Sequence, residues 1–122
     1  MKLEFSSFAD AGDHDKERIV IKALSDLDIG EYAVFLSALS DTRSPTAGRK
    51  TAYWFPDGMV KPGDLIVLYS KSGSSSKKDI GEGRTAHFYY WGLDKAVWGN
   101  DDKTAVILRI AEWTHRNPKM MQ

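Results

Sequence analysis

The sequence predicts an all-β fold, a sandwich or small barrel of about six to eight strands. Three observations support this prediction. Short apolar runs rich in Val, Ile and aromatic residues recur along the chain, and turns rich in Gly, Pro, Asp and Ser separate them. No run carries the caps and period of a confident helix. Because no helical crossover separates the apolar runs, a parallel α/β fold is disfavoured.

Composition narrows the class of protein further. The chain has 122 residues, of which 42% are hydrophobic and 28% charged, as expected for one globular domain. Its 17 basic and 17 acidic side chains give a formal net charge of zero. That balance argues against a dedicated nucleic-acid binder, which needs a surplus of cations facing the phosphates. Cysteine is absent, which excludes disulfides, thiol nucleophiles and thiolate zinc sites.

The candidate strands begin after an irregular amino-terminal segment. Residues 1–16 have no clean period, so we expect a flexible or loosely docked arm, with Phe5 and Phe8 as its anchors. Six strands are expected to follow: Glu17–Leu24, Tyr32–Leu39, Arg49–Phe55, Leu65–Tyr69, Ala86–Trp91 and Thr104–Trp113. The second of these runs contains good helix formers, but it is short and aromatic, which favours a strand.

The segments between these strands have the chemistry of turns. Pro56-Asp57-Gly58 and Pro62-Gly63-Asp64 each combine a fixed Pro φ with a permissive Gly. Residues 70–85 hold several serines and almost nothing to bury, so we expect a mobile loop there. Gly99–Asp102 is a further turn, and the tail 114–122 is expected to fray.

Four segments carry a resemblance to a known family: LDIGEYAV at 27–34, YWFPDG at 53–58, VKPGDLIVL at 60–68 and WGNDDKTAVIL at 98–108. Together they resemble the lamin-tail domain, an immunoglobulin-like β-sandwich. The resemblance covers residues 17–113. It implies an immunoglobulin-like fold over that range and a binding or scaffold module, since the family offers no catalytic residues to transfer.

Two aromatic clusters are the most informative feature for function. Tyr53, Trp54 and Phe55 are consecutive, and so are the residues from Phe88 to Trp91. Neighbours in a strand point to opposite faces, so part of each cluster must face outward. Outward aromatic side chains are enriched at protein interfaces. We therefore predict a non-enzymatic module that binds a protein partner or a second copy of itself through these residues: Tyr53, Trp54, Phe88, Tyr90 and Trp91.

The alternative is a small ligand-binding protein or enzyme with a site near His87, which would need an acidic partner such as Asp101 or Asp102 in a pocket. Neither a metal nor another cofactor is expected, because the three histidines have no metal-ligand spacing. A third alternative is weak nucleic-acid binding through the 71–84 loop. The amino terminus lacks the apolar run of a secretory signal, and no stretch is apolar over a membrane span, so a cytoplasmic location is expected.

Overall fold

The computed structural model describes residues 1–121 and is all-β, which confirms the predicted class. Gln122, the last residue of the expected frayed tail, lies outside the described residues. The strands are β1 Leu3–Ala9, β2 Arg18–Ala23, β3 Leu27–Asp28, β4 Tyr32–Ala38, β5 Thr51–Trp54, β6 Met59–Val60, β7 Leu65–Tyr69, β8 Ser76–Gly81, β9 Arg84–Tyr90 and β10 Lys103–Arg109. Two short 3-10 helices, η1 and η2, cover Ile29–Glu31 and Pro118–Met121.

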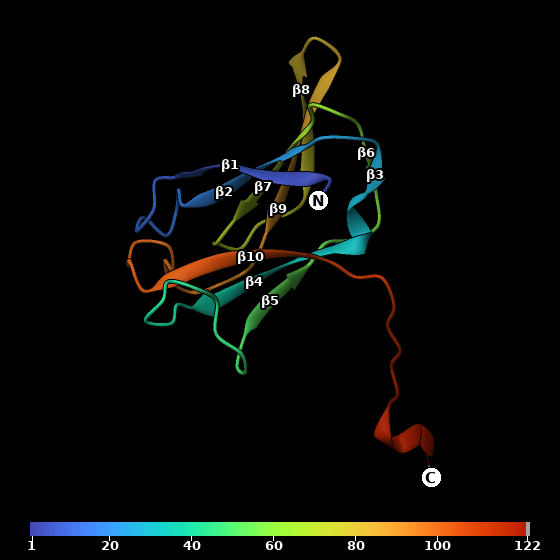
Figure 1. Ribbon diagram of the computed structural model, residues 1–122. Helices are drawn as coiled ribbons and strands as arrows, with labels where there is room; N and C mark the ends of the chain where they lie inside the picture. The colour runs from blue at the N-terminus through green and yellow to red at the C-terminus, as the bar shows by residue number, and fades with distance from the viewer. Residues whose placement is uncertain (122) are drawn as a thin grey trace.

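The strands form three sheets. A five-stranded sheet has the order β1-β2-β7-β9-β8, a three-stranded sheet the order β10-β4-β5, and β3 pairs with β6. All neighbouring strands are antiparallel except β7 and β9, which run parallel. Figure 1 shows the five-stranded sheet lying over the three-stranded one, and the hydrophobic core fills the space between them.

Alternation along the strands builds this core. Ile19 and Ile21 of β2 and Ile66 and Leu68 of β7 are fully buried, and they pack in one cluster with Val34 from the opposite sheet. Each such side chain contributes about 1.5–3 kcal/mol when it leaves water. Each of the six predicted strands corresponds to a strand of the structure: β2, β4, β5, β7, β9 and β10.

The expectation of an arm over residues 1–16 is wrong for its first half. Leu3–Ala9 form β1, which pairs with β2 at the edge of the five-stranded sheet. Its alternation is hidden in the sequence because the register shifts between Phe5 and Ser7, as at a β-bulge. Phe5 and Phe8 stack on each other, with ring centroids 5.7 Å apart, and Phe8 contacts Trp98 edge-on.

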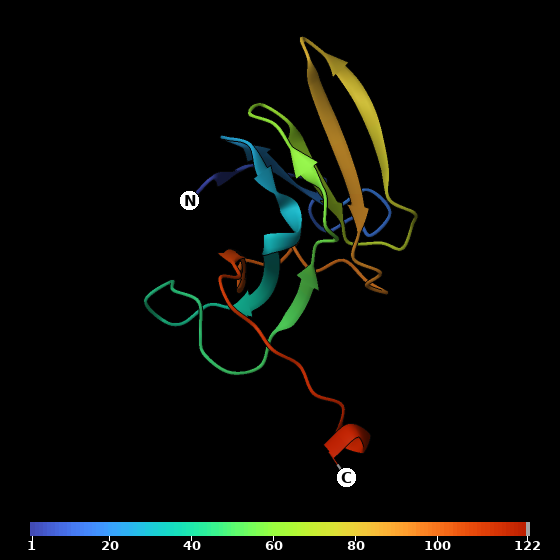
Figure 2. The ribbon, with the colours of Figure 1, turned by 90° about the vertical axis from the view of Figure 1, so that its right-hand side faces the viewer.

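The expected mobile loop over residues 70–85 is also wrong in part. Ser76–Gly81 form β8, an edge strand antiparallel to β9, and Figure 2 shows this hairpin projecting beyond the other strands. Every side chain of β8 is exposed, so the strand has no hydrophobic period for the sequence to display. Its turn places Gly81, Glu82 and Gly83 at positive φ. With β1, β3, β6 and β8 added, the strands of residues 1–121 exceed the expected number.

Strand β10 ends at Arg109, before the predicted end at Trp113. After the hydrogen bond from Ile110 N to Glu31 O, the chain leaves the sheets and extends away from them to η2 (Figures 1 and 2). Residues 111–120 are exposed.

Candidate functional site

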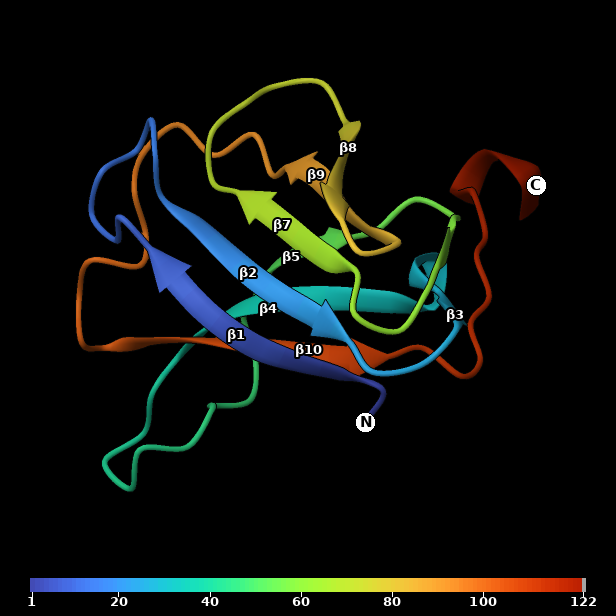
Figure 3. The same ribbon diagram turned by 90° about the horizontal axis from the view of Figure 1, so that it is seen from above.

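The five-stranded sheet has an apolar face on the side away from the core. Its register pairs Val20 with Val67, Val67 with Phe88, and Tyr69 with Tyr90, which puts these side chains on one face. We call this surface the outer sheet face and define it by Val20, Leu65, Val67, Tyr69, Ala86, Phe88 and Tyr90. Figure 3 shows no other strand lying over the central strands of this face.

Aromatic stacking and lysines mark one end of the outer sheet face. The Tyr69 and Tyr90 rings lie parallel, with centroids 5.1 Å apart and planes 9° apart. Lys71 Nζ lies 5.2 Å from the centroid of Tyr69. Lys78 pairs in register with Ala86 and so shares this face, and neither lysine enters an ion pair in the described part of the chain. Arg18 and Lys22 of β2 pair in register with Tyr69 and Leu65, so the face is apolar at its centre and has cations on both sides.

The structure divides the predicted partner-binding residues among three places. Phe88 and Tyr90 lie on the outer sheet face. Tyr53 and Trp91 are half-buried against the core, with ring centroids 6.2 Å apart. Trp54, 48% exposed, packs edge-on against Trp113, which is 61% exposed and comes from the tail. The five residues do not form one surface.

His87 is buried on the core side of the same sheet, beside Asp64. Its Nε2 lies 2.9 Å from Asp64 Oδ2, and both side chains are more than nine-tenths buried. The backbone N–H groups of Lys61 and Thr85 donate to the same carboxylate. Burial by itself raises the pKa of Asp64, but the hydrogen bond from His87 and the two backbone bonds outweigh it, so this pKa lies below its ordinary value. Asp64 is therefore ionised at neutral pH, and His87 is held in one orientation.

The acidic partner of His87 was assigned wrongly from sequence. Asp101 pairs with Arg43 and Asp102 with Lys103, and neither is bonded to His87. Asp64 takes that place because the parallel pairing of β7 with β9 aligns Leu65 with Ala86, so the residue before β7 reaches the start of β9. The sequence presents Asp64 only as the last residue of a Pro-Gly-Asp turn.

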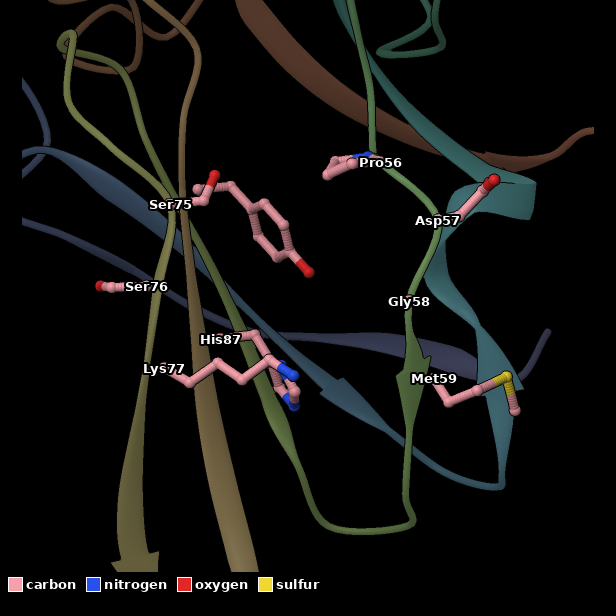
Figure 4. Close-up of a pocket in the computed structure, with 9 residues that line it drawn as sticks. Pro56, Asp57, Gly58, Met59, Ser75, Ser76, Lys77 and His87 are labelled. Atoms are coloured by element: carbon pink, nitrogen blue, oxygen red, sulfur yellow. The ribbon is translucent and has the colours of Figure 1, made fainter.

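A cavity of about 250 Å³ opens beside His87. The Pro56–Met59 connection between β5 and β6 forms one wall, the Ser75–Lys77 segment entering β8 forms the other, and His87 and Tyr89 of β9 complete the lining. In Figure 4 the side chains of Lys77 and His87 point into the space between the walls, whereas the carboxylate of Asp57 points away from it. The cavity therefore presents hydrogen-bond donors and a cation.

A second buried carboxylate, Glu17, has a different environment. It is fully buried and accepts hydrogen bonds from Ser70 Oγ and from three backbone N–H groups, those of Gly12, Val97 and Trp98. Burial raises the pKa of Glu17, and the four bonds lower it further than burial raises it. Glu17 does not line the cavity beside His87. We therefore assign it a structural role.

Within residues 1–121 no three side chains of His, Cys, Asp or Glu gather as a metal site would require. No helix in that range is long and apolar enough to cross a membrane. Comparisons with known proteins add no relative: no family model, no curated protein and no solved structure matches the chain.

Proposed function

We propose that this chain is a non-enzymatic protein-interaction module that binds a partner protein on the outer sheet face. One observation carries the proposal. Strands β7 and β9 carry apolar side chains on both faces, a pattern typical of strands that are covered on both sides. The core covers one of these faces. On the outer sheet face Val67 and Ala86 are already buried, and the other side chains that define it remain partly exposed for a partner.

Charge indicates what kind of partner fits. Lys22, Lys71 and Lys78 flank the outer sheet face without an ion-pair partner in the described residues, whereas Arg18 pairs with Asp10. Two copies meeting face to face would bring these lysines together. We therefore favour a different protein, with an apolar centre and an acidic rim, over self-association.

The finer fold is part of the same proposal: an immunoglobulin-like sandwich of the lamin-tail type. Two features support it. The Pro62-Gly63-Asp64 turn leads directly into β7, and the Trp98-to-Asp102 segment leads into β10, as the resemblance implies. A binding or scaffold role agrees with a family of interaction modules.

Site-specific photo-cross-linking in cells tests the proposal. A benzophenone side chain is placed at Phe88 or at Tyr90, and the control position is Phe5. Phe5 is 41% exposed and thus more accessible than Phe88, so non-specific capture would favour the control. We expect one discrete adduct at Phe88 and Tyr90 and none at Phe5. Equal adducts at all three positions would refute a dedicated face, and an adduct of twice the chain's mass would refute the choice of a different protein.

Binding measurements with the partner so identified form the second stage. Phe88→Thr keeps a good strand former and removes the ring, and we expect affinity to fall about tenfold or more, as for an interface anchor. Phe5→Thr is the matched control and should leave affinity unchanged. Replacing Lys71 and Lys78 with Gln should slow association and weaken its dependence on salt. Unchanged affinity in Phe88→Thr would contradict the proposal.

A further inference from the structure

The cavity beside His87 lies on the opposite side of the sheet from the outer sheet face, so it can be considered independently of the proposed function. Its walls come from the β5–β6 connection and from β8, and its volume of about 250 Å³ suits a group of the size of one amino acid. Five of its lining residues have side chains with a hydrogen-bond donor: Ser75, Ser76, Lys77, His87 and Tyr89.

Lys77 is the cation of this cavity. Its cross-strand partner is His87, so both side chains lie on the same face of the sheet. Lys77 is exposed and enters no ion pair among residues 1–121. Figure 4 shows its side chain directed toward the imidazole of His87. The ammonium group is therefore free to meet an anion.

His87 is held in one orientation in the wall of the cavity. Its Nε2 is bonded to Asp64, whereas Nδ1 has no partner in residues 1–121. In the same residues Trp98 Nε1 is the only fully buried side-chain nitrogen or oxygen without a hydrogen-bond partner. The unpaired His87 Nδ1 is therefore not fully buried, and it is accessible from the cavity that the ring lines. Because the ionised Asp64 can only accept, His87 Nε2–H donates to it, and this bond fixes the orientation of the ring.

Tyr89 adds a neutral donor. Burial, together with the nearby Tyr53, raises the pKa of the Tyr89 phenol, so its hydroxyl keeps its proton at neutral pH. The charged and titratable groups around His87 are thus Asp64 before β7, Lys77 on β8 and Tyr89 on β9. Asp57 lies over Gly30, where an added Cβ would collide with its carboxylate, and it points away from the cavity.

We propose that this cavity binds a carboxylate group, either of a small free acid or of a polypeptide's terminal residue. A monoanion fits better than a phosphate dianion, because the site has one lysine and the negative charge of Asp64 lies beside His87. Pro56 provides an apolar wall for the group attached to the carboxylate.

Titration of the isotope-labelled full chain, followed by amide and imidazole NMR shifts, tests this site. The probes are acetate, N-acetylleucine and the uncharged N-acetylleucinamide. We expect saturable shifts at His87, Tyr89 and Ser75 with both acids, and binding about tenfold weaker or absent with the amide. Tighter binding of N-acetylleucine than of acetate assigns the site to a polypeptide terminus, and equal binding assigns it to a small acid. Equal binding of the amide would overturn the proposal.

Two lysine variants provide matched controls. Lys77 and Lys78 are neighbours on the same exposed strand, but only Lys77 shares the face of His87. Lys77→Met should weaken N-acetylleucine binding about tenfold, and Lys78→Met should leave it unchanged. Equal losses in both variants would overturn the site as described. The measured quantity is binding of a small acid and not of the partner protein, so this result is separate from that of the partner experiment.

Discussion

Ser70 Oγ donates a 2.5 Å hydrogen bond to Glu17 Oε2 in the interior, between residues 53 positions apart in the chain. The same carboxylate also accepts from the backbone N–H groups of Gly12, Val97 and Trp98. One buried charge thus ties together the β1–β2 loop, the end of β7 and the segment before β10. The segment before β10 is also held by apolar packing, because Trp98 belongs to the core and Val97 packs against it.

Glu17→Gln should destabilise the fold by about 2–4 kcal/mol. The amide keeps one acceptor oxygen. Its NH₂ group replaces the other oxygen and faces N–H or O–H groups that had donated to the carboxylate, so these groups lose their acceptor. Urea unfolding followed by tryptophan fluorescence measures the change. Glu31→Gln is the control, because the Glu31–Arg109 pair is exposed at 3.7 Å and contributes less than about 1 kcal/mol. Equal effects of the two substitutions would show that the four bonds to Glu17 add nothing to stability.

Stability should fall as the pH drops below about 4. The pKa values of Glu17 and Asp64 are lower in the folded chain than their ordinary values, so the unfolded state binds more protons in that range. Their stabilising contribution is complete above the unfolded values and is lost as pH falls through the folded ones. Urea midpoints measured from neutral pH to about pH 2.5 give the slope. Glu17→Gln should flatten it, and a slope identical to the wild type would contradict the assignment.

Local patterns were sufficient to predict the central strands. The run Leu65–Tyr69 is apolar throughout and β-branched in the middle, and it forms β7 with the same bounds. Strand β8 was missed because its side chains are all exposed, and β1 because a register shift hides its alternation. Both strands form because they pair with a neighbouring strand. The sequence of one segment alone does not indicate such pairing.

The candidate sites depend even more on contacts between distant segments. His87 was singled out from its aromatic surroundings, but its partner Asp64 follows only from the parallel β7–β9 pairing. The five aromatic residues predicted to form one binding surface lie in three places. Alternation predicts that neighbouring residues point to opposite faces of a strand, but it does not predict which face is covered. Trp113 was expected at the end of the last strand, but β10 ends at Arg109 and Trp113 packs against Trp54 from the tail.

Gly30→Ala should destabilise the fold by about 1–3 kcal/mol, the usual cost of overpacking. An added Cβ would lie 2.7 Å from Asp57 Cα, a backbone contact that cannot simply rotate away. Gly58→Ala is the matched control from the same pair of turns. Its added Cβ would meet only Ile29 Cγ2, at 3.9 Å, and the N–H that Gly58 donates to Asp28 remains. Thermal unfolding of the two variants separates them, and equal melting temperatures would contradict the close approach of the two segments.

Trp113→Ala should release the tail without unfolding the sheets. Trp113 holds the tail through its edge-on contact with Trp54, whose Nε1 is fixed by a 2.8 Å hydrogen bond to Gly30 O. Such an aromatic pair contributes about 0.5–1.5 kcal/mol, enough to order a segment that makes few other contacts. Tryptic cleavage after Arg116 should therefore be faster in the variant, while the urea midpoint of the sheets changes little. Met120→Ala, at a residue 71% exposed, is the control and should cleave like the wild type. If Trp113→Ala cleaves no faster than this control, the tryptophan contact does not hold the tail.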